Sequence, residues 1–502
     1  MLLNAFEMAT PVHQSPGLWR HPESRAADFD QLSYWTDLAQ TLDRGGFTAL
    51  FLADVLGTYD VYGGSDAVSH ERGVQVPLLD PFAAVSAMAA VTRRLGFGLT
   101  ASCTYEDPFL LARRFASLDH LTGGRVGWNI VTSYQDSAAR NLGLERQLPH
   151  DERYDRADEY MDVMYKLFEG SFAPGSVLKD ADAGVFVDPA GVRKAEHSGE
   201  YFSVDGALLT HPGPQRTPFL FQAGASARGL RFGAENAEAV FMIGSEPSVV
   251  GGYIDRLREA LEAAGRPAAA VRTFAMVTVV TGADDEDARR RFESYKQYVD
   301  VEGALALFAG WTGVDLAGLD PDAPLAEVET DANQSALRSV TSGDTTREWT
   351  VRDIAAFVTL GGRGPVIVGG PESVADQLEA WQAASGVDGF NVCSGVRPAD
   401  LERFVEYVSP ELRSRGLLAD ADDADDAGAA AETVTLRASV TGQDWLPDSH
   451  RGSRFRSDAL VEAGSQAFPF RPRIADERVP WDAPRCPLPH RNSAAADCDD
   501  VL

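Results

Sequence analysis

Residues 95–133 have the sequence LGFGLTASCTYEDPFLLARRFASLDHLTGGRVGWNIVTS, and this stretch decides the fold class because it places a strand, a helix and a strand in succession. Its ends, 95–102 and 125–133, are short apolar runs, typical of strands buried on both faces of a parallel sheet. Between them, residues 108–121 have a helical apolar pattern that stops before Gly123-Gly124, a signal for a helix C-terminus. The stretch therefore predicts one βαβ unit.

The same alternation extends in both directions over the first four hundred residues. We expect further strands at residues 3–8, 48–54, 218–224, 237–243, 272–282 and 365–370. We expect further helices at residues 32–44, 151–170, 226–236, 247–264, 284–299 and 371–385, and one that opens at Asp80-Pro81. The count approaches eight strand–helix units, which favours an α/β fold of the (β/α)8 TIM barrel type over an open doubly wound sheet.

The barrel is expected to occupy residues 1–418, with insertions near 171–217 and 300–350. The acidic, low-complexity residues 419–432 are predicted to be a solvated linker. Residues 433–502 contain many Pro, Arg and Asp with little periodicity, and we expect an extended C-terminal arm that packs on the barrel or on a partner subunit.

The net charge of -30, from 45 Lys+Arg against 75 Asp+Glu, excludes a nucleic-acid binder that works through a generally basic surface. Only four of the cations are Lys. High-GC codon usage explains Arg in place of Lys, but not the acidic excess, so we favour adaptation to a saline cytoplasm. The four cysteines form no C-x-x-C pair, and no basic leader or run of 18 apolar residues occurs. A reducing, cytoplasmic location is therefore expected.

The chain lacks a phosphate loop, a nucleophile elbow, an H-E-x-x-H zinc helix and a G-x-G-x-x-G turn after a strand, so no metal or Rossmann site is predicted. Instead, polar residues follow the predicted strands at their C-terminal ends: Asp54, Thr100, Ser102 and Asn129. Barrel enzymes place their active sites at that end. Each residue alone is more commonly a helix cap or a turn residue, but four in equivalent positions on consecutive strands favour a site.

Two further elements indicate an anion site. His150 and Tyr154 lie four residues apart at a predicted helix start, so both face one side and can donate hydrogen bonds there. Ser226 follows a strand that ends at Gly224, where backbone amides and a hydroxyl can hold a phosphate. The alternatives are an exposed, charge-paired helix start and an ordinary Ser cap.

The loop after the first strand, PVHQSPGLWRHP, carries His13 and Trp19, and Phe6 lies late in the strand itself. A histidine in a loop is commonly a surface residue. Above a barrel mouth it could instead donate a proton.

Long ordered motifs connect these features: LNAFEMATPVHQSPGLWRHP (3–22), FLADVLGTYDVYGG (51–64), DPFAAVSAMAAVT (80–92), LARRFASLDHLTGGRVGWNIVTS (111–133), HDERYDRADEYMDVMYKLFEG (150–170) and QAGASARG (222–229). Together they resemble the bacterial-luciferase-like flavin monooxygenases, within the branch of nitrilotriacetate and dibenzothiophene-sulfone monooxygenases. The resemblance covers residues 3 to about 416, and more loosely LPDSHRGSRFR in the tail.

The resemblance implies the oxygenase component of a two-component system. A separate NAD(P)H:flavin reductase would supply reduced FMN, which reacts with O₂ to give a C4a-hydroperoxyflavin in a dry pocket. The expected substrate is a small organosulfur compound such as a dialkyl sulfide, or a similar xenobiotic. Loops 55–79 and 300–350 would line its pocket. A homodimer or a dimer of dimers, and no membrane or nucleic-acid partner, is expected.

Carried over residue by residue, the family pattern assigns FMN contacts to Asp54, Thr100, His150, Tyr154 and Ser226. Tyr154 and Ser226 fit the phosphate, and Asp54 and Thr100 fit the ring system. Ser102 and Asn129 are secondary candidates for FMN contacts. His13 and Asp54 are the candidate catalytic residues, and Phe6 and His13 face the substrate. A cis peptide under the flavin is expected at Ala101–Ser102. Two alternatives stay open: an F420-dependent hydride-transfer oxidoreductase on the same barrel, and a non-enzymatic member.

Overall fold

The computed structural model of the protein describes residues 1–224, 226–322, 349–419 and 434–456. Nearly all of the predicted acidic linker, the tail beyond residue 456 with Cys486 and Cys498, and much of the second predicted insertion lie outside the described residues. Within these ranges no helix is long and apolar enough to cross a bilayer.

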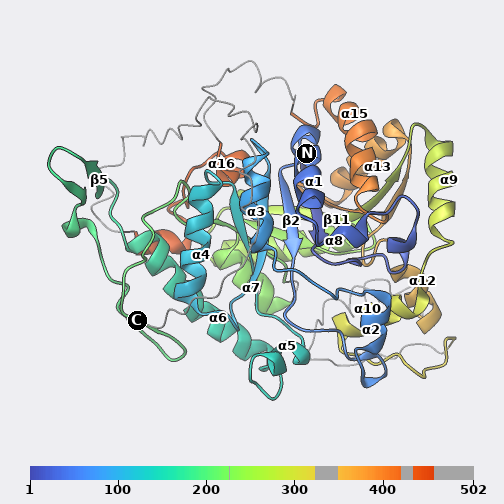
Figure 1. Ribbon diagram of the computed structural model, residues 1–502, viewed down its shortest axis with the longest axis horizontal. Coiled ribbons are helices and arrows are strands. Elements are labelled where there is room, and N and C mark those ends of the chain that lie inside the picture. Colours follow the sequence, from blue (N-terminus) through green and yellow to red (C-terminus); the bar gives the residue numbers. More distant parts are fainter. Residues whose placement is uncertain (225, 323–348, 420–433, 457–502) are drawn as a thin grey trace, which may run out of the picture. The chain divides into compact units, whose positions relative to one another are not determined.

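Eight parallel strands close into a barrel, as the alternating pattern predicted (Figure 1). Around the barrel each strand pairs with the next, and the closure comes from the pairing of β10 with β11 and of β13 with β1. The strands of the barrel are β1 (Leu2–Met8), β2 (Ala49–Ala53), β3 (Gly96–Ser102), β4 (Val126–Val131), β9 (Phe219–Gln222), β10 (Ala239–Met242), β11 (Arg272–Thr281) and β13 (Gly389–Cys393).

The predicted strand at 365–370 is not a member of the barrel. It forms β12 (Val366–Gly369), which among the described strands pairs with the last residues of the long strand β11, Thr278–Thr281. The eighth barrel strand is β13, which the sequence pattern missed, and which pairs with the first half of β11 and with β1. Its five residues, GFNVC, are too short an apolar run to stand out without the strands beside it.

Helices surround the barrel (Figure 1). They are α1 (Leu32–Gly45), α2 (Ala67–Arg72), α3 (Phe82–Ala90), α4 (Pro108–Leu121), α5 (Asp136–Asn141), α6 (His150–Tyr165), α7 (Ala227–Asn236), α8 (Pro247–Ala263), α9 (Asp285–Tyr295), α10 (Val301–Thr312), α12 (Val351–Val358), α13 (Pro371–Ser385), α14 (Ala399–Arg403), α15 (Ser409–Ser414) and α16 (Leu436–Thr441). Local signals set their ends. The Asp107 side chain accepts from the Leu110 amide and Pro108 opens α4, while Asp80 accepts from the Phe82 amide at the start of α3.

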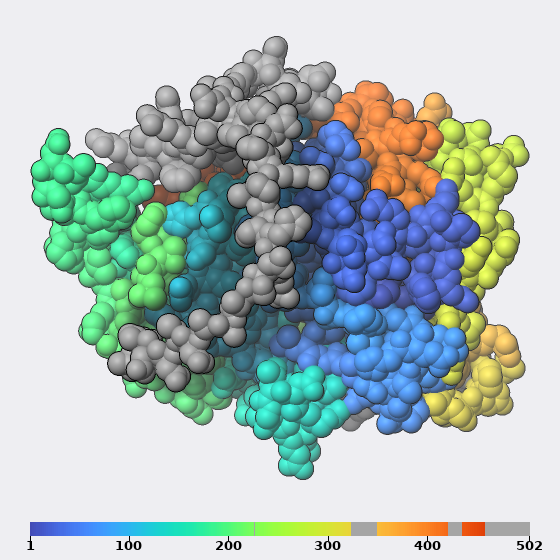
Figure 2. All heavy atoms as spheres, in the orientation of Figure 1, coloured from blue at the N-terminus to red at the C-terminus, as the bar shows by residue number. Residues whose placement is uncertain are grey.

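The first predicted insertion consists of two small antiparallel hairpins that project from the barrel. They contain β5 (Val177–Asp180) with β6 (Val185–Val187), and β7 (His197–Ser198) with β8 (Ser203–Val204). In Figure 2 this green segment projects at the left edge, whereas the blue N-terminal segments and the yellow and orange ones form the right-hand part of the same face. The described part of the second predicted insertion contains α10, and α12 follows directly after that insertion.

Phenylalanine rings fill the barrel. Phe51, Phe221 and Phe241 lie with their ring centroids 4.3–5.6 Å apart, and Phe6, Phe219 and Phe274 pack beside them. Gly98 and Gly127 make room, because a Cβ on either would lie 2.6 Å from one of these rings. The interior is therefore a packed core, as in other TIM barrels, and a site can form only at its mouth.

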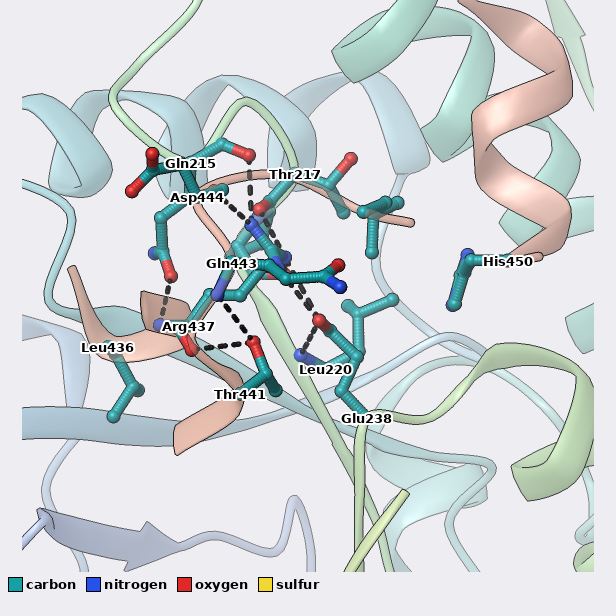
Figure 3. Close-up of polar contacts among 12 residues, drawn as sticks. Gln215, Thr217, Leu220, Glu238, Leu436, Arg437, Thr441, Gln443, Asp444 and His450 are labelled. Atoms are coloured by element: carbon teal, nitrogen blue, oxygen red, sulfur yellow. Dashed lines mark hydrogen bonds and ion pairs between the residues drawn. The ribbon is translucent and has the colours of Figure 1, made fainter. Parts of the chain in front are cut away.

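The C-terminal arm covers the end of the barrel that lies opposite the mouth. Leu436 and Val440 of α16 pack against the phenylalanine cluster, where the strands begin. Arg437 from the same helix is fully buried and lies between Gln215, Thr217 and Glu238 (Figure 3). Of the two expectations for the tail, the described part therefore packs on its own barrel.

Candidate active site

The residues predicted at the strand ends lie along one arc of the rim, because β1, β2, β3, β4 and β9 are successive neighbours in the barrel. Thr100 and Asn129 are cross-strand partners, and the Asn129 amide donates to the Thr100 hydroxyl at 3.0 Å. Both side chains point into the barrel. Their neighbours Leu99, Trp128 and Ile130 belong to the large apolar cluster between the strands and the helices, and successive side chains of a strand point to opposite faces. The Asn129 Oδ1 atom is buried without a hydrogen-bond partner among the described residues, so it is open to a donor from a bound molecule.

Ser102 ends β3 and accepts a hydrogen bond from the Ser133 hydroxyl at 2.8 Å. The expected cis peptide at Ala101–Ser102 is not found. The cis bonds of the described chain are Val76–Pro77 and Arg397–Pro398. The β3–β4 pairing runs without interruption through Ala101 and Ser102, and this regular ladder goes with a trans peptide.

The three residues of the predicted anion site come together. His150 begins α6, and its Nε2 atom lies 3.3 Å from the Ser226 hydroxyl. Its ring centroid is 5.1 Å from that of Tyr154. Ser226 is the N-cap of α7 and accepts from the Gly229 amide at 3.0 Å. Burial raises the pKa of Tyr154 to about 12, so its hydroxyl stays protonated and can donate.

Two glycines keep this place open. A Cβ on Gly224 would lie 2.9 Å from the Tyr154 hydroxyl, and one on Gly229 only 2.8 Å from it. The first turn of α7 therefore presents the amides of Ala227 and Arg228, which have no acceptor among the described residues, beside a serine, a tyrosine and a histidine. Helix N-termini with such donors bind anionic groups, phosphate above all.

Arg228 adds a positive charge that the sequence interpretation missed. Its guanidinium lies 5.3 Å from the centre of the Tyr154 ring, and Asp158 and Asp155 hold it at 2.6 and 3.2 Å. The Nη1 atom is buried and has no partner within the described ranges. Arg228 could have been identified from the sequence by its position in the first turn of the helix, two residues after the Ser226 cap.

Asp54 follows β2 at the rim and is half-buried. Burial, followed by repulsion from Asp80, raises the pKa of Asp54 to about 8. At neutral pH its carboxyl group therefore carries a proton and can donate a hydrogen bond, which an ordinary aspartate cannot.

This shift predicts a pH-dependent stability. In the unfolded chain Asp54 titrates near about 3.9, so between about pH 4 and pH 8 the folded state binds more protons. The free energy of unfolding then falls as pH rises through that interval. Asp54→Asn removes the titration, and we expect it to gain about 1–2 kcal/mol on the parent between pH 6 and pH 9, after allowance for solvent screening. Thermal unfolding at both pH values measures it, and a constant difference between the two proteins would contradict it.

Phe6 and His13 also meet, with ring centroids 4.5 Å apart at the end of β1. His13 is 4% exposed, which excludes the surface-residue alternative. Burial, then the positive field of Arg397, holds the pKa of His13 well below its ordinary value. His13 is thus a neutral imidazole with one N–H, and its Nε2 atom lies 3.1 Å from the Gln14 amide.

Beside His13 lies a hydrogen-bonded chain of side chains whose individual residues the sequence did not predict. Gln75 donates to the His13 carbonyl at 3.0 Å and accepts from the Tyr59 hydroxyl at 2.8 Å. The Tyr59 and Tyr134 hydroxyls are 2.7 Å apart. Two of these residues fall in loop 55–79, which was expected to line a pocket, but loop residues carry no periodicity that would single them out.

Apolar residues of the second insertion pack behind this chain. Tyr59 shares a cluster with Leu307, Phe308 and Trp311 of α10 and Ile354 of α12, and Tyr134 packs against it. This cluster is separate from the main core and excludes water from one side of the rim.

The chain matches the luciferase-like monooxygenase family over residues 6–389. It is 50% identical over 483 residues to dimethyl-sulfide monooxygenase of Hyphomicrobium sulfonivorans, which covers 96% of this chain and 98% of that one. Dibenzothiophene-sulfone and nitrilotriacetate monooxygenases are also similar to it, as the motifs predicted.

Two solved structures have a similar fold. The crystal structure of DmoA from Hyphomicrobium sulfonivorans superposes with a TM-score of 0.83 and 46% identity, covering 94% of this chain and all of the other. Riboflavin lyase (RcaE), solved with modified FMN and riboflavin, gives a TM-score of 0.83 and 34% identity, with 91% and 99% covered. The barrel expected from the sequence and the family resemblance are both confirmed.

Proposed function

The chain belongs to the luciferase-like monooxygenase family, and on that premise we propose that it is the oxygenase component of a two-component monooxygenase that uses reduced FMN. The anion cradle at the start of α7 carries the proposal, because glycines, a capping serine and a buried tyrosine phenol fit a phosphate. The solved neighbour with modified FMN supports the choice of flavin.

Ser226, Tyr154 and His150 would hold the FMN phosphate, with Arg228 as a further donor. The orphaned Asn129 Oδ1 atom and the Thr100 hydroxyl would accept from the flavin ring, and the protonated Asp54 would donate to it. When bound and reduced, the cofactor would supply the oxygen chemistry, in which one oxygen atom of O₂ would enter the substrate and the other would leave as water.

The chain's own residues would shield and orient the reaction. The apolar cluster around Trp311 keeps water from one side of the rim, and Phe6 offers an apolar wall. The neutral His13 is fixed by the Gln14 amide at its Nε2 atom and by a backbone hydrogen bond with Phe6, and the Tyr59–Tyr134 pair lies on the same side. We propose a small organosulfur compound as substrate, because the relatives with 50% identity and with the sulfone name both act on such compounds.

The deciding experiment loads the protein with reduced FMN without oxygen, then mixes it rapidly with O₂ while the flavin spectrum is recorded. It should be run in several molar salt, given the net charge of -30. A transient C4a-hydroperoxyflavin spectrum is expected. Addition of an NAD(P)H:flavin reductase should then support turnover of a sulfide. Failure to bind reduced FMN, or binding of reduced F420 in its place, would overturn the proposal.

A further inference from the structure

A second charged residue of interest, Arg363, lies beside the loop after β1 and not at the anion cradle of α7. Arg363 lies in the loop between α12 and β12. This loop packs on the one after β1: the Gly361 amide donates to the Ser15 hydroxyl at 3.1 Å, and a Cβ on Gly362 would overlap the Gln14 side chain. The loop is thus fixed next to His13.

The Arg363 side chain is held by stacking. Its guanidinium carbon lies 4.5 Å from the centre of the Trp311 ring. Tyr59, Tyr134 and His13 all lie within range of its electrostatic field. A cation over the face of a tryptophan is favourably oriented, and the guanidinium edge then stays available for hydrogen bonds.

No acid neutralises this arginine in the described part of the chain. Its side chain forms no ion pair or hydrogen bond there, although it is half-buried and its Nε atom is fully inaccessible. Three other buried arginines pair with carboxylates: Arg397 with Glu7, Arg216 with Glu169, and Arg437 with Glu238. Two more, Arg125 and Arg266, donate to backbone carbonyls instead, whereas Arg363 has neither kind of acceptor among the described residues. A partly desolvated cation without a partner costs stability, and such a cost is typical of a binding site.

We propose that Arg363 is an anion-recognition residue of the substrate pocket, and that the substrate carries a carboxylate or sulfonate group. This inference rests on the proposed function, since it deepens the substrate class from a neutral sulfide to an organosulfur acid. The planar guanidinium matches two oxygens of either group, and the hydroxyls of Tyr59 and Tyr134 lie beside it.

The surrounding charges agree with this assignment. Burial lowers the pKa of the Arg363 guanidinium, and the nearby Tyr134 and Tyr59 oppose that effect, so the group stays cationic at any working pH. His13 is neutral and adds no competing charge. The surface, with a net charge of -30, attracts no anion at long range, so recognition has to come from a local cation such as this one.

A pair of small probes tests the charge requirement. Methanesulfonate and dimethyl sulfone are nearly isosteric, but only the first is an anion. Titration calorimetry on the protein loaded with oxidised FMN should show methanesulfonate binding about 10- to 100-fold more tightly than dimethyl sulfone. Arg363→Gln should remove that preference and leave the sulfone unchanged. Arg363→Lys should restore part of it, because lysine keeps the charge but loses the planar fork.

Arg352→Gln is the matched control. Arg352 lies in the neighbouring helix α12, is exposed and pairs with Asp322, so its loss should leave both probe affinities unchanged. Equal affinities for the two probes, or an unchanged preference in Arg363→Gln, would overturn the proposal. Displacement of methanesulfonate by chloride at a similar concentration would also overturn the proposal, since it would show a site for any small anion.

The FMN titration of each variant separates this inference from the proposed function. If no variant binds FMN, the flavin assignment fails, and the two probes are then compared on the flavin-free protein. A Ser226→Ala variant shows in that case whether methanesulfonate occupies the cradle of α7. Loss of binding in Ser226→Ala but not in Arg363→Gln would place the anion in the cradle and contradict the role of Arg363.

Discussion

Replacing Gly229 with alanine is expected to weaken FMN binding by about 100-fold, the loss that follows when one or two charge-assisted hydrogen bonds are broken. The new Cβ would lie 2.8 Å from the Tyr154 hydroxyl and 3.1 Å from the Gly224 Cα atom. Tyr154 has little room to move away, because it is buried and packs against Phe232 and His150. The cradle for the phosphate would therefore close.

Gly252→Ala provides the matched control for this change. Gly252 also lies inside a helix, α8, but a Cβ there meets nothing within 4 Å. Alanine should raise helix stability at that position by up to about 1 kcal/mol and leave FMN binding unaltered. Quenching of flavin fluorescence measures the affinity, and circular dichroism checks the fold. Parent-like affinity in Gly229→Ala would show that the phosphate binds elsewhere.

Much of the site could be predicted because strand periodicity is local information. A polar residue at the end of an apolar run marks the rim of a parallel barrel, and Thr100 and Asn129 were placed on that basis. His150 and Tyr154 followed from helical spacing, and their meeting with Ser226 followed from the family resemblance. The strands β1, β2, β3, β4 and β9, which form the arc of the rim with the candidate site, were all predicted within two residues of their observed ends.

The features that were missed depend on contacts between distant segments. Tyr59 and Tyr134 are 75 residues apart in sequence, and neither carries a pattern that predicts their hydrogen bond. Arg363 is informative only because no acid pairs with it among the described residues, which no sequence shows. Likewise, β13 became identifiable only as the partner of β1 and β11. The raised pKa of Asp54 depends on burial and on Asp80, and so on the folded chain.

The arm helix α16 gives the second large effect. Arg437→Met is expected to lower the free energy of unfolding by about 3–5 kcal/mol, the range found when one partner of a buried ion pair is removed. Arg437 contacts both Glu238 oxygens, at 2.7 and 2.9 Å, and donates to the carbonyls of Gln215, Thr217 and Pro218 (Figure 3). Without it, the Glu238 carboxylate stays buried with the Leu220 amide as its remaining donor within the described residues.

The double variant Arg437→Met, Glu238→Gln distinguishes two causes of the lost stability: the broken ion pair, and displacement of helix α16 from the barrel end. If the uncompensated charge of Glu238 causes the loss, the double variant should regain a large part of it, because a neutral amide costs less to bury than a carboxylate. If the loss comes from α16 leaving the barrel end, where Leu436 and Val440 pack, the double variant should be no more stable than the single one. Arg454→Met, an exposed change in the same arm, should stay within about 0.5 kcal/mol of the parent. Chemical denaturation of the four proteins measures all of these differences, and a parent-like Arg437→Met would contradict the stabilising role of the Arg437–Glu238 pair.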